Sequence, residues 1–402
     1  MARKIEIYLP PDHFSFYFAM PPYILYNRKQ IIDTRGKNMQ YICSKCGHAE
    51  DVSTRKAKCE CGGLWKLDYQ PPKFDLDKVD KNTWSLFRYR EFMPLEGDTW
   101  KEITMGEGMT PIIRLDEDVL LKMDYYMPTL SFKDRGAAVL VAHCKAIGVD
   151  KVVQDSSGNA GNSVAAYCGK AGIECEIFVP EGTSPKKITM IKSHGAKANV
   201  VPGNREACAN ACRSKVENEG IFYCSHVYNP FFYEGTKTYI YETYEQLGRI
   251  PEYIFIPTGN GTLFIGAMKA LEHLLESGAI EKMPHVVGVQ SERCNPLDEA
   301  VKTGSKEPAA VVSVPTLAEG IAIAEPMRGV EILEYVYKYN IEIQTVPEDE
   351  ILNARAALAE KGVFCEHTTA GTYAAYLAYC RKHGKTSDAL LPMCGAGLKS
   401  EH

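Results

Sequence analysis

The chain has 402 residues, of which 45% are hydrophobic and 24% are charged, and its formal net charge is −5. This composition is typical of a globular protein that is long enough to bury more than one hydrophobic core. The acidic balance argues against a nucleic-acid partner, and because no run of 18 apolar residues occurs, the sequence predicts no membrane span.

Residues 1–38 contain a short aromatic stretch, from Phe14 to Met20, followed by two prolines. No small-residue cleavage site stands out after it, so it is a poor signal peptide and we expect a cytoplasmic protein. Met39 directly precedes the first recognisable unit. Two interpretations stay open: residues 1–38 are an extension ahead of a true start at Met39, or they form an arm that packs on the body or on a partner subunit.

The next unit, residues 39–70, contains the cysteine pairs Cys43-x2-Cys46 and Cys59-x-Cys61. Two short turns of this kind can bring four thiolates together tetrahedrally, as Zn²⁺ prefers, and four protein ligands leave no open position. The spacing therefore predicts a structural zinc ribbon. The alternative is a small β-hairpin of reduced thiols without metal. The other ten of the 14 cysteines follow apolar patterns and indicate core thiols in a reducing compartment.

Residues 130–136 read Leu-Ser-Phe-Lys-Asp-Arg-Gly and begin an apolar helical stretch. Partial burial and a cationic neighbour such as Arg135 would lower the pKa of Lys133 and make its amine a nucleophile for Schiff-base chemistry. Taken alone, the segment is better explained by a solvated surface lysine. Two later loops favour the functional interpretation.

Each of these loops follows a predicted strand and precedes a predicted helix. The first contains Ser156, Ser157, Gly158 and Asn159, and the second contains Gly259, Asn260, Gly261 and Thr262. Glycine lets backbone N–H groups approach a ligand, and the N-terminus of a helix favours negative charge. The first loop therefore suits a carboxylate and the second a phosphate. Neither is a Walker loop, because no Gly-Lys-Ser/Thr follows.

From about residue 135 the chain alternates strand and helix. Strands are predicted at 152–154, 175–180, 198–201, 221–224, 253–257, 286–289, 341–346 and 389–393, and helices at 137–147, 185–193, 207–217 and 348–361. This alternation predicts an α/β fold with two open, mainly parallel, helix-covered sheets and a ligand at the carboxyl ends of the strands. Residues 71–402 would form one catalytic domain, with a smaller subdomain at about 135–245 inserted in the larger.

In this order the motifs resemble the pyridoxal-phosphate enzymes of fold type II and, among them, the threonine synthase family. The segments that carry the resemblance are 106–111, 131–136, 156–161, 229–238 and 394–399. The resemblance implies a tryptophan synthase β-like fold, pyridoxal 5'-phosphate as coenzyme, and conversion of O-phospho-L-homoserine and water to L-threonine and phosphate. We also expect a homodimer that acts on a small amino-acid substrate.

The same resemblance implies a role for each candidate residue. Lys133 would bond to the coenzyme and then move protons at the substrate carbons, while Asn159 would hydrogen-bond the coenzyme's phenolic oxygen. Ser156, Ser157 and Gly158 would hold the substrate carboxylate, and residues 259–262 the coenzyme phosphate. The alternative for Asn159 is an Asx-turn that shapes its own loop. Cys394 stands where the family places a hydroxyl beside the ring nitrogen, and a protonated thiol would remain a neutral partner there.

Two departures from the family leave the reaction open. Phe232 occupies the place of an arginine that binds the substrate's phosphate, so we expect an apolar substrate wall, with Lys237, Arg205 or Arg293 as replacement anchors. Residues 316–322 are more similar to threonine and serine dehydratases, and they bring Glu319 near the coenzyme or substrate unless it caps a helix. The alternatives are a related lyase or β-replacement enzyme of the cysteate synthase, diaminopropionate ammonia-lyase or threonine/serine dehydratase type, and a non-catalytic zinc-ribbon adaptor.

Overall fold

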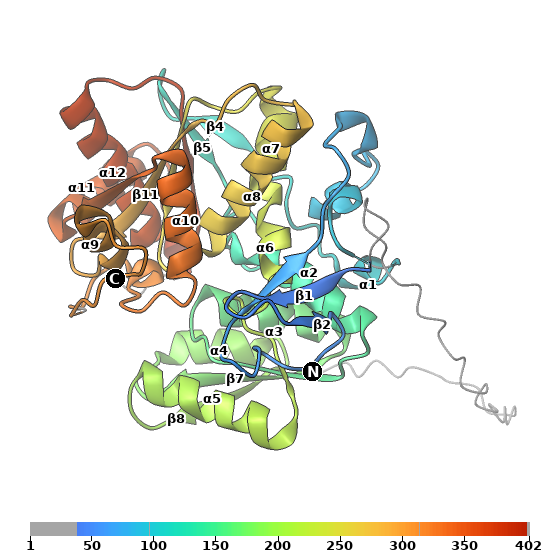
Figure 1. Ribbon diagram of the computed structural model, residues 1–402. Coiled ribbons are helices and arrows are strands. Elements are labelled where there is room, and N and C mark those ends of the chain that lie inside the picture. Colours follow the sequence, from blue (N-terminus) through green and yellow to red (C-terminus); the bar gives the residue numbers. More distant parts are fainter. Residues whose placement is uncertain (1–37, 96, 313, 400–402) are drawn as a thin grey trace, which may run out of the picture. The chain divides into compact units, whose positions relative to one another are not determined.

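The computed structural model describes residues 38–95, 97–312 and 314–399. The expectations for residues 1–37 therefore lie outside the described residues. Within the described part, the strands form three sheets, of three, six and four strands (Figure 1).

The three-stranded sheet is antiparallel and comes first in the chain. Its order is β2-β1-β3, with β1 at Gln40–Cys43, β2 at Ala49–Asp51 and β3 at Trp65–Asp68. The ring of Tyr41 stacks on Trp65, with 5.9 Å between centroids, and meets the edge of Phe231 at 6.2 Å. Phe231 belongs to the larger α/β part of the chain, so the small sheet shares its apolar core with that part.

The four-stranded sheet is parallel throughout and has the order β8-β7-β6-β9. Its strands are β6 (Lys151–Gln154), β7 (Glu174–Pro180), β8 (Lys197–Val201) and β9 (Phe222–Tyr223). The helices that connect them are α3 (Asn159–Ala171), α4 (Pro185–Ser193) and α5 (Arg205–Glu219).

The six-stranded sheet has the order β12-β11-β10-β13-β5-β4 and is parallel except at its β4–β5 edge. Its strands are β4 (Ile112–Arg114), β5 (Val119–Lys122), β10 (Tyr253–Pro257), β11 (His285–Ser291), β12 (Glu342–Val346) and β13 (Ala389–Pro392). The remaining α-helices are α1 (Trp100–Ile103), α2 (Lys133–Ala146), α6 (Phe231–Thr236), α7 (Thr238–Leu247), α8 (Thr262–Ser277), α9 (Pro296–Thr303), α10 (Gly329–Tyr339), α11 (Glu348–Glu360) and α12 (His367–His383). Short 3-10 helices occur at η1 (Leu76–Lys78), η2 (Leu86–Phe92), η3 (Glu319–Ile321) and η4 (Gly397–Lys399).

These two sheets confirm the predicted α/β architecture, and all eight predicted strands are present. The sequence did not reveal β4 and β5. Strand β4 has only three residues, and β5 ends in Lys122, whose charge obscures a buried apolar run. That lysine is fully buried, and its amine donates to Glu242 at 2.9 Å and to the carbonyl of Thr110 at 2.6 Å.

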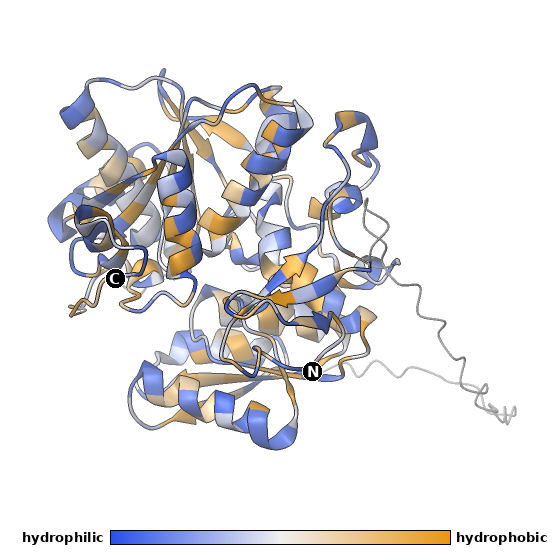
Figure 2. Ribbon diagram, in the orientation of Figure 1, coloured by the Kyte–Doolittle hydropathy of each residue, from blue (hydrophilic) through white to orange (hydrophobic). Residues whose placement is uncertain are grey.

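Apolar residues concentrate on the strands and on the covered sides of the helices, while hydrophilic residues occupy the outer helix faces (Figure 2). Such burial is the main favourable term in folding. No helix in the described part of the chain combines the length and apolarity needed to cross a membrane.

Helix α2 begins at Lys133, four residues before the predicted start at Ala137. The carboxylate of Asp134, in its first turn, accepts hydrogen bonds from the backbone and hydroxyl of Thr129 at 2.7 and 2.5 Å. The early start therefore fixes Lys133 at a helix N-terminus, where the helix dipole disfavours an additional positive charge.

Candidate functional site

A cavity of about 270 Å³ lies at the carboxyl ends of strands from both mainly parallel sheets. It is lined by the loops after β6 and β10, by the start of α2, by η3 and by Cys394, which follows β13. The sequence-predicted residues that line it are Lys133, Ser156, Ser157, Gly158, Asn159, Gly259, Asn260, Gly261, Thr262, Glu319 and Cys394. Five segments that are separated in the sequence therefore meet in one site.

The amine of Lys133 reaches into this cavity and donates a hydrogen bond to the hydroxyl of Thr262 at 2.6 Å. Among the described residues, no carboxylate forms an ion pair with it. Burial lowers the pKa of Lys133 to about 7, and the nearby charge of Arg205 acts in the same direction. A large fraction of this amine is therefore neutral, and so nucleophilic, at neutral pH.

Arg135 does not contribute to this shift in the way that the sequence predicted. Its guanidinium is fully buried and forms ion pairs with Asp124 at 2.8 Å and with Glu242 at 2.7 Å. A charge neutralised by two carboxylates has little net effect on a neighbouring amine, so Arg135 is a structural residue. Burial, which the sequence also predicted, is the main cause of the low pKa of Lys133, and Arg205 takes the place of Arg135 as the cationic neighbour.

The loop after β6 places the N-terminus of α3 at the cavity. Helix α3 begins at Asn159, and its N-cap, Gly158, has open space where a Cβ would point. A Cβ on Gly161 would lie only 1.8 Å from the carbonyl oxygen of Ser156, so only glycine allows this tight loop. Backbone N–H groups, the hydroxyls of Ser156 and Ser157 and the positive end of the helix dipole suit a carboxylate.

The side chain of Asn159 does not form the Asx-turn that was the alternative interpretation. Its amide nitrogen instead donates to the carboxylate of Glu366 at 3.0 Å, across the cavity wall. No motif in the sequence pointed to Glu366, which lies 207 residues away and immediately before α12.

The loop after β10 forms the N-terminus of α8, a 16-residue helix. Its N-cap, Gly261, has φ +76°, a left-handed conformation that glycine adopts without strain. Gly259 lies against the 321–323 segment, where a Cβ would approach Ile321 and Ile323 to 3.0–3.1 Å. The side-chain oxygen of Asn260 accepts a hydrogen bond from the backbone of Met327 at 3.3 Å. This loop presents N–H groups and a helix dipole to an anion such as a phosphate.

Cys394 follows β13 and its thiol is buried in the cavity wall. Burial raises the pKa of this thiol well above its usual value. The thiol is therefore protonated and neutral, as the role beside a coenzyme ring nitrogen requires.

Phe232 is not a substrate wall, and this expectation needs correction. The ring is fully buried, does not line the cavity, and packs on α2, where a Cβ on Gly136 would come within 2.3 Å of it. The amine of Lys133 lies 5.7 Å from the ring centroid. Phe232 thus supports the helix that carries the lysine instead of contacting a ligand.

Of the three cations predicted as replacement anchors for a phosphate, one lines the cavity and two do not. Lys237 is buried and binds Glu234 at 2.6 Å, and Arg293 donates to the carbonyl of Pro315, away from the cavity. Arg205, the first residue of α5, lines the cavity and is exposed. It has no hydrogen-bond or ion-pair partner among the described residues.

The cavity also contains Glu319, which the sequence predicted, and two titratable residues that it did not predict, Lys399 and His226. Glu319 forms an ion pair with Lys187 of α4 at 3.0 Å and does not cap a helix. Lys399 donates to the carbonyl of Thr129 at 2.6 Å. His226 also lines the cavity, and burial lowers its pKa well below 6.5, so its imidazole is neutral.

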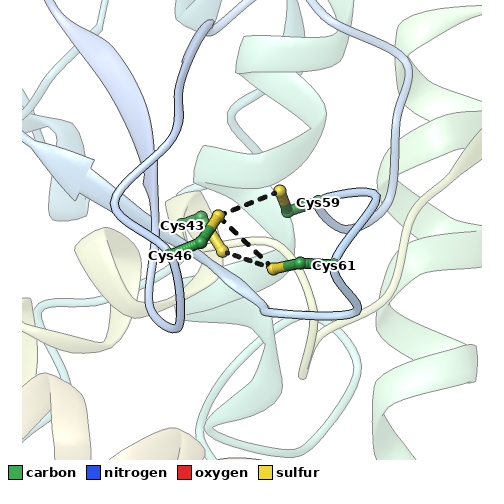
Figure 3. A group of neighbouring side chains, drawn as sticks. All are labelled: Cys43, Cys46, Cys59 and Cys61. Carbon is green, nitrogen blue, oxygen red and sulfur yellow. Dashed lines mark hydrogen bonds between the residues drawn. The ribbon is translucent and has the colours of Figure 1, made fainter.

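The four ribbon cysteines converge in the structure as their spacing predicted (Figure 3). Their sulfur atoms all lie within 4.8 Å of one another, with Cys43–Cys61 at 3.4 Å and Cys46–Cys59 at 3.7 Å. Zn–S bonds of about 2.3 Å in a tetrahedron need sulfur atoms roughly 3.8 Å apart. The geometry therefore fits a four-thiolate Zn²⁺ site.

A model of the "pyridoxal-phosphate dependent enzyme" family matches residues 103–395, which include the whole cavity except part of its C-terminal rim. The chain belongs to this family. Lys133, whose amine has no carboxylate partner among the described residues, would suit the coenzyme's aldehyde, and the neutral Cys394 thiol would suit its ring nitrogen. The loops at 156–159 and 259–262 would suit carboxylate and phosphate groups.

Within the family, the chain is similar to threonine synthases. It is 30% identical over 347 residues to the threonine synthase of Methanocaldococcus jannaschii, covering 83% of this chain and 85% of that protein. It is 31% identical over 329 residues to that of Halalkalibacterium halodurans, covering 78% and 89%. These matches confirm membership of the threonine synthase family.

Solved structures support the fold type II architecture. The processed form of threonine deaminase isoform 2 from Solanum lycopersicum aligns with a TM-score of 0.65 and 21% identity, covering 81% of this chain and 86% of that one. O-ureido-L-serine synthase aligns with a TM-score of 0.60 and 20% identity, covering 76% and 93%. At this level of identity the likeness concerns the fold alone, and it confirms the predicted fold type.

Proposed function

We propose that this pyridoxal-phosphate-dependent lyase converts O-phospho-L-homoserine and water to L-threonine and phosphate. The observation that carries the substrate assignment is Arg205, an exposed guanidinium in the cavity without a partner among the described residues. A guanidinium binds phosphate through two parallel hydrogen bonds. Arg205 would thus take the role of the arginine that Phe232 replaces.

The residues of the cavity would have separate catalytic and binding roles in this reaction. The coenzyme, bonded to Lys133, supplies an electron-withdrawing group that makes the substrate's Cα and Cβ protons acidic. Lys133, with a pKa of about 7, can accept a proton at Cα and return it, and the Thr262 hydroxyl orients its amine. Ser156, Ser157 and the N-terminus of α3 would hold the substrate carboxylate, while residues 259–262 would hold the coenzyme phosphate.

The second candidate is a related lyase or β-replacement enzyme that acts on an uncharged or smaller leaving group. It is favoured by Glu319, whose carboxylate neutralises Lys187 and so reduces the positive charge of the cavity. A phosphate dianion would have to compete with that carboxylate for the lysine.

The test is kcat/KM for O-phosphohomoserine, O-phosphoserine, threonine, serine and diaminopropionate with the wild type and Arg205→Gln. A charge-assisted hydrogen bond is worth roughly 1.5–3 kcal/mol, so loss of the guanidinium should lower kcat/KM for phosphohomoserine by at least about tenfold. Threonine and serine should change little. Arg213→Gln is the matched control, because Arg213 lies on the same helix outside the cavity. Absence of threonine and phosphate from phosphohomoserine, with 2-oxoacid and ammonia from threonine, would establish the second candidate.

We also propose one structural zinc ion per chain at Cys43, Cys46, Cys59 and Cys61, a homodimer, and a cytoplasmic location. The support for the zinc is the sulfur geometry. The support for a reducing compartment is that all 14 cysteines are free. Light scattering and metal analysis of the purified protein would test the first two.

A further inference from the structure

The contact between Asn159 and Glu366 joins the two walls of the cavity. Asn159 begins α3 beside the four-stranded sheet, and Glu366 precedes α12 beside the six-stranded sheet. Their hydrogen bond, 3.0 Å from the amide nitrogen to a carboxylate oxygen, is the one side-chain bond of Asn159 within the described residues. Both residues line the cavity together with Lys133.

The position of Glu366 is fixed from several sides. Its backbone N–H donates to the carbonyl of Gly395 at 3.0 Å, and a Cβ on Gly395 would lie 2.3 Å from the carboxyl carbon. Glu366 is the N-cap residue of α12, yet its side chain makes no capping bond. Helix N-caps favour Ser, Thr, Asp and Asn, so capping does not explain a glutamate at this position.

A carboxylate beside an asparagine determines which way the amide points. An ionised carboxylate only accepts hydrogen bonds, so the NH2 group of Asn159 must face it. One N–H of that group is used by Glu366, and the second remains a donor. If Glu366 were absent, the amide could turn by 180° and present its carbonyl oxygen instead.

We propose that Glu366 is a positioning residue that holds the Asn159 amide in the orientation that donates an N–H to the coenzyme's phenolic oxygen. The inference rests on the proposed role of Asn159 and on the coenzyme of the family, and it does not depend on which amino acid is the substrate. A hydrogen bond to the ionised form of a group favours that form, so the correctly turned amide lowers the pH at which the bound coenzyme ionises.

The charged and titratable groups that face Glu366 are Lys133, Lys399, Cys365, Cys394 and Glu319, in addition to the uncharged Asn159. Burial raises the pKa of Glu366, whereas the bond from Asn159 and the two lysines oppose the increase. Removing its charge would by itself make ionisation of the coenzyme easier and lower the midpoint. Loss of the amide orientation would raise the midpoint, so the two effects have opposite signs.

The experiment is a pH titration of the visible absorption of the coenzyme-loaded full chain, comparing Glu366→Ala with Glu366→Gln. Both variants lack the charge, but glutamine keeps a carbonyl oxygen that can accept from Asn159. We expect the midpoint of Glu366→Ala to lie about one pH unit above that of Glu366→Gln, because one unit corresponds to the tenfold effect of a hydrogen bond to a charged group. The coenzyme dissociation constant, from a fluorescence titration, should be at least about fivefold higher for the alanine variant.

Two controls separate this role from a purely structural one. Glu234→Gln removes a carboxylate that is buried outside the cavity, and it should lower the melting temperature without moving the midpoint. Asn159→Ala removes the amide but keeps the carboxylate of Glu366, so it should raise the midpoint above the wild-type value. Equal midpoints for the alanine and glutamine variants of Glu366 would overturn the inference. A wild-type midpoint in Asn159→Ala would instead overturn the proposed role of Asn159 itself.

Discussion

Phe232→Arg introduces the residue that the resemblance to threonine synthases leads us to expect at this position, and the structure predicts that it damages the protein. The wild-type ring is fully buried, packed on Gly136, and 5.7 Å from the amine of Lys133. The ring also lies 5.8 Å from the ring of His226, between centroids, so an arginine here would be a buried cation beside the Lys133 amine and a neutral imidazole.

The magnitude follows from two terms. Loss of a fully buried aromatic ring costs about 3–5 kcal/mol, and an uncompensated buried charge costs a further 3 kcal/mol or so. Together they approach the 5–15 kcal/mol by which typical domains are stable. A second positive charge about 6 Å from the lysine would also repel its ammonium by roughly 3 kcal/mol at an effective dielectric constant of about 20. The pKa of Lys133 should therefore fall below its wild-type value of about 7.

The assay is urea denaturation together with kcat/KM for O-phosphohomoserine, with Phe232→Leu as the apolar control. We expect the arginine variant to be insoluble or less stable by at least about 3 kcal/mol, and the leucine variant to lose only about 1–2 kcal/mol. An arginine variant with wild-type stability and improved turnover would refute the reasoning, because it would mean that position 232 reaches the cavity.

Three further predictions concern the amine, its titration and the metal. Borohydride reduction of the coenzyme-loaded protein should trap an adduct on Lys133, and Lys133→Ala should yield none; mass spectrometry that maps the adduct to another lysine would contradict this assignment. Because the neutral amine is the nucleophile, the rate of coenzyme loading should rise with pH around a midpoint of about 7, and Arg205→Gln should move the midpoint upward, whereas a midpoint near 10 would exclude a depressed pKa. Removal of zinc by a chelator, or Cys43→Ser, should lower the melting temperature and also weaken coenzyme binding. The link is Arg328, which donates to the carbonyl of Trp65 in β3 at 3.0 Å and to the carbonyl of Tyr228 at 2.8 Å. Less than about a tenth of an equivalent of zinc in fully folded protein would count against the metal site.

Local patterns were enough to predict most of the fold. The eight strands that the sequence revealed are apolar runs bounded by turn residues, and their alternation with helices is typical of parallel sheets. Strands β4 and β5 escaped prediction because one has three residues and the other ends in a buried lysine, Lys122. The ion pair that makes this lysine tolerable involves Glu242, 120 residues away, and no local pattern contains it.

Some residues of the candidate site could likewise be predicted from local patterns, and others could not. Lys133, the loop at 156–159 and the loop at 259–262 could be identified from the sequence, because each is a short motif whose function depends on its own backbone conformation. The four zinc-ribbon cysteines belong to this group as well, since the spacing within each pair shapes the turns that hold them. For all of these groups, the local spacing of the residues was enough to identify them as candidates.

The tertiary structure alone decided what lies around Lys133. Phe232 lies in the core, and Arg205, instead of Lys237 or Arg293, lines the cavity. Glu366 contacts Asn159, although 207 residues separate them in the sequence. The tertiary structure also showed that Arg205, instead of Arg135, is the cation that acts with burial to lower the pKa of the lysine. The physical reason is that burial and electrostatic interaction depend on distances in space, and the side chains that set them come from helices and loops far apart in the chain.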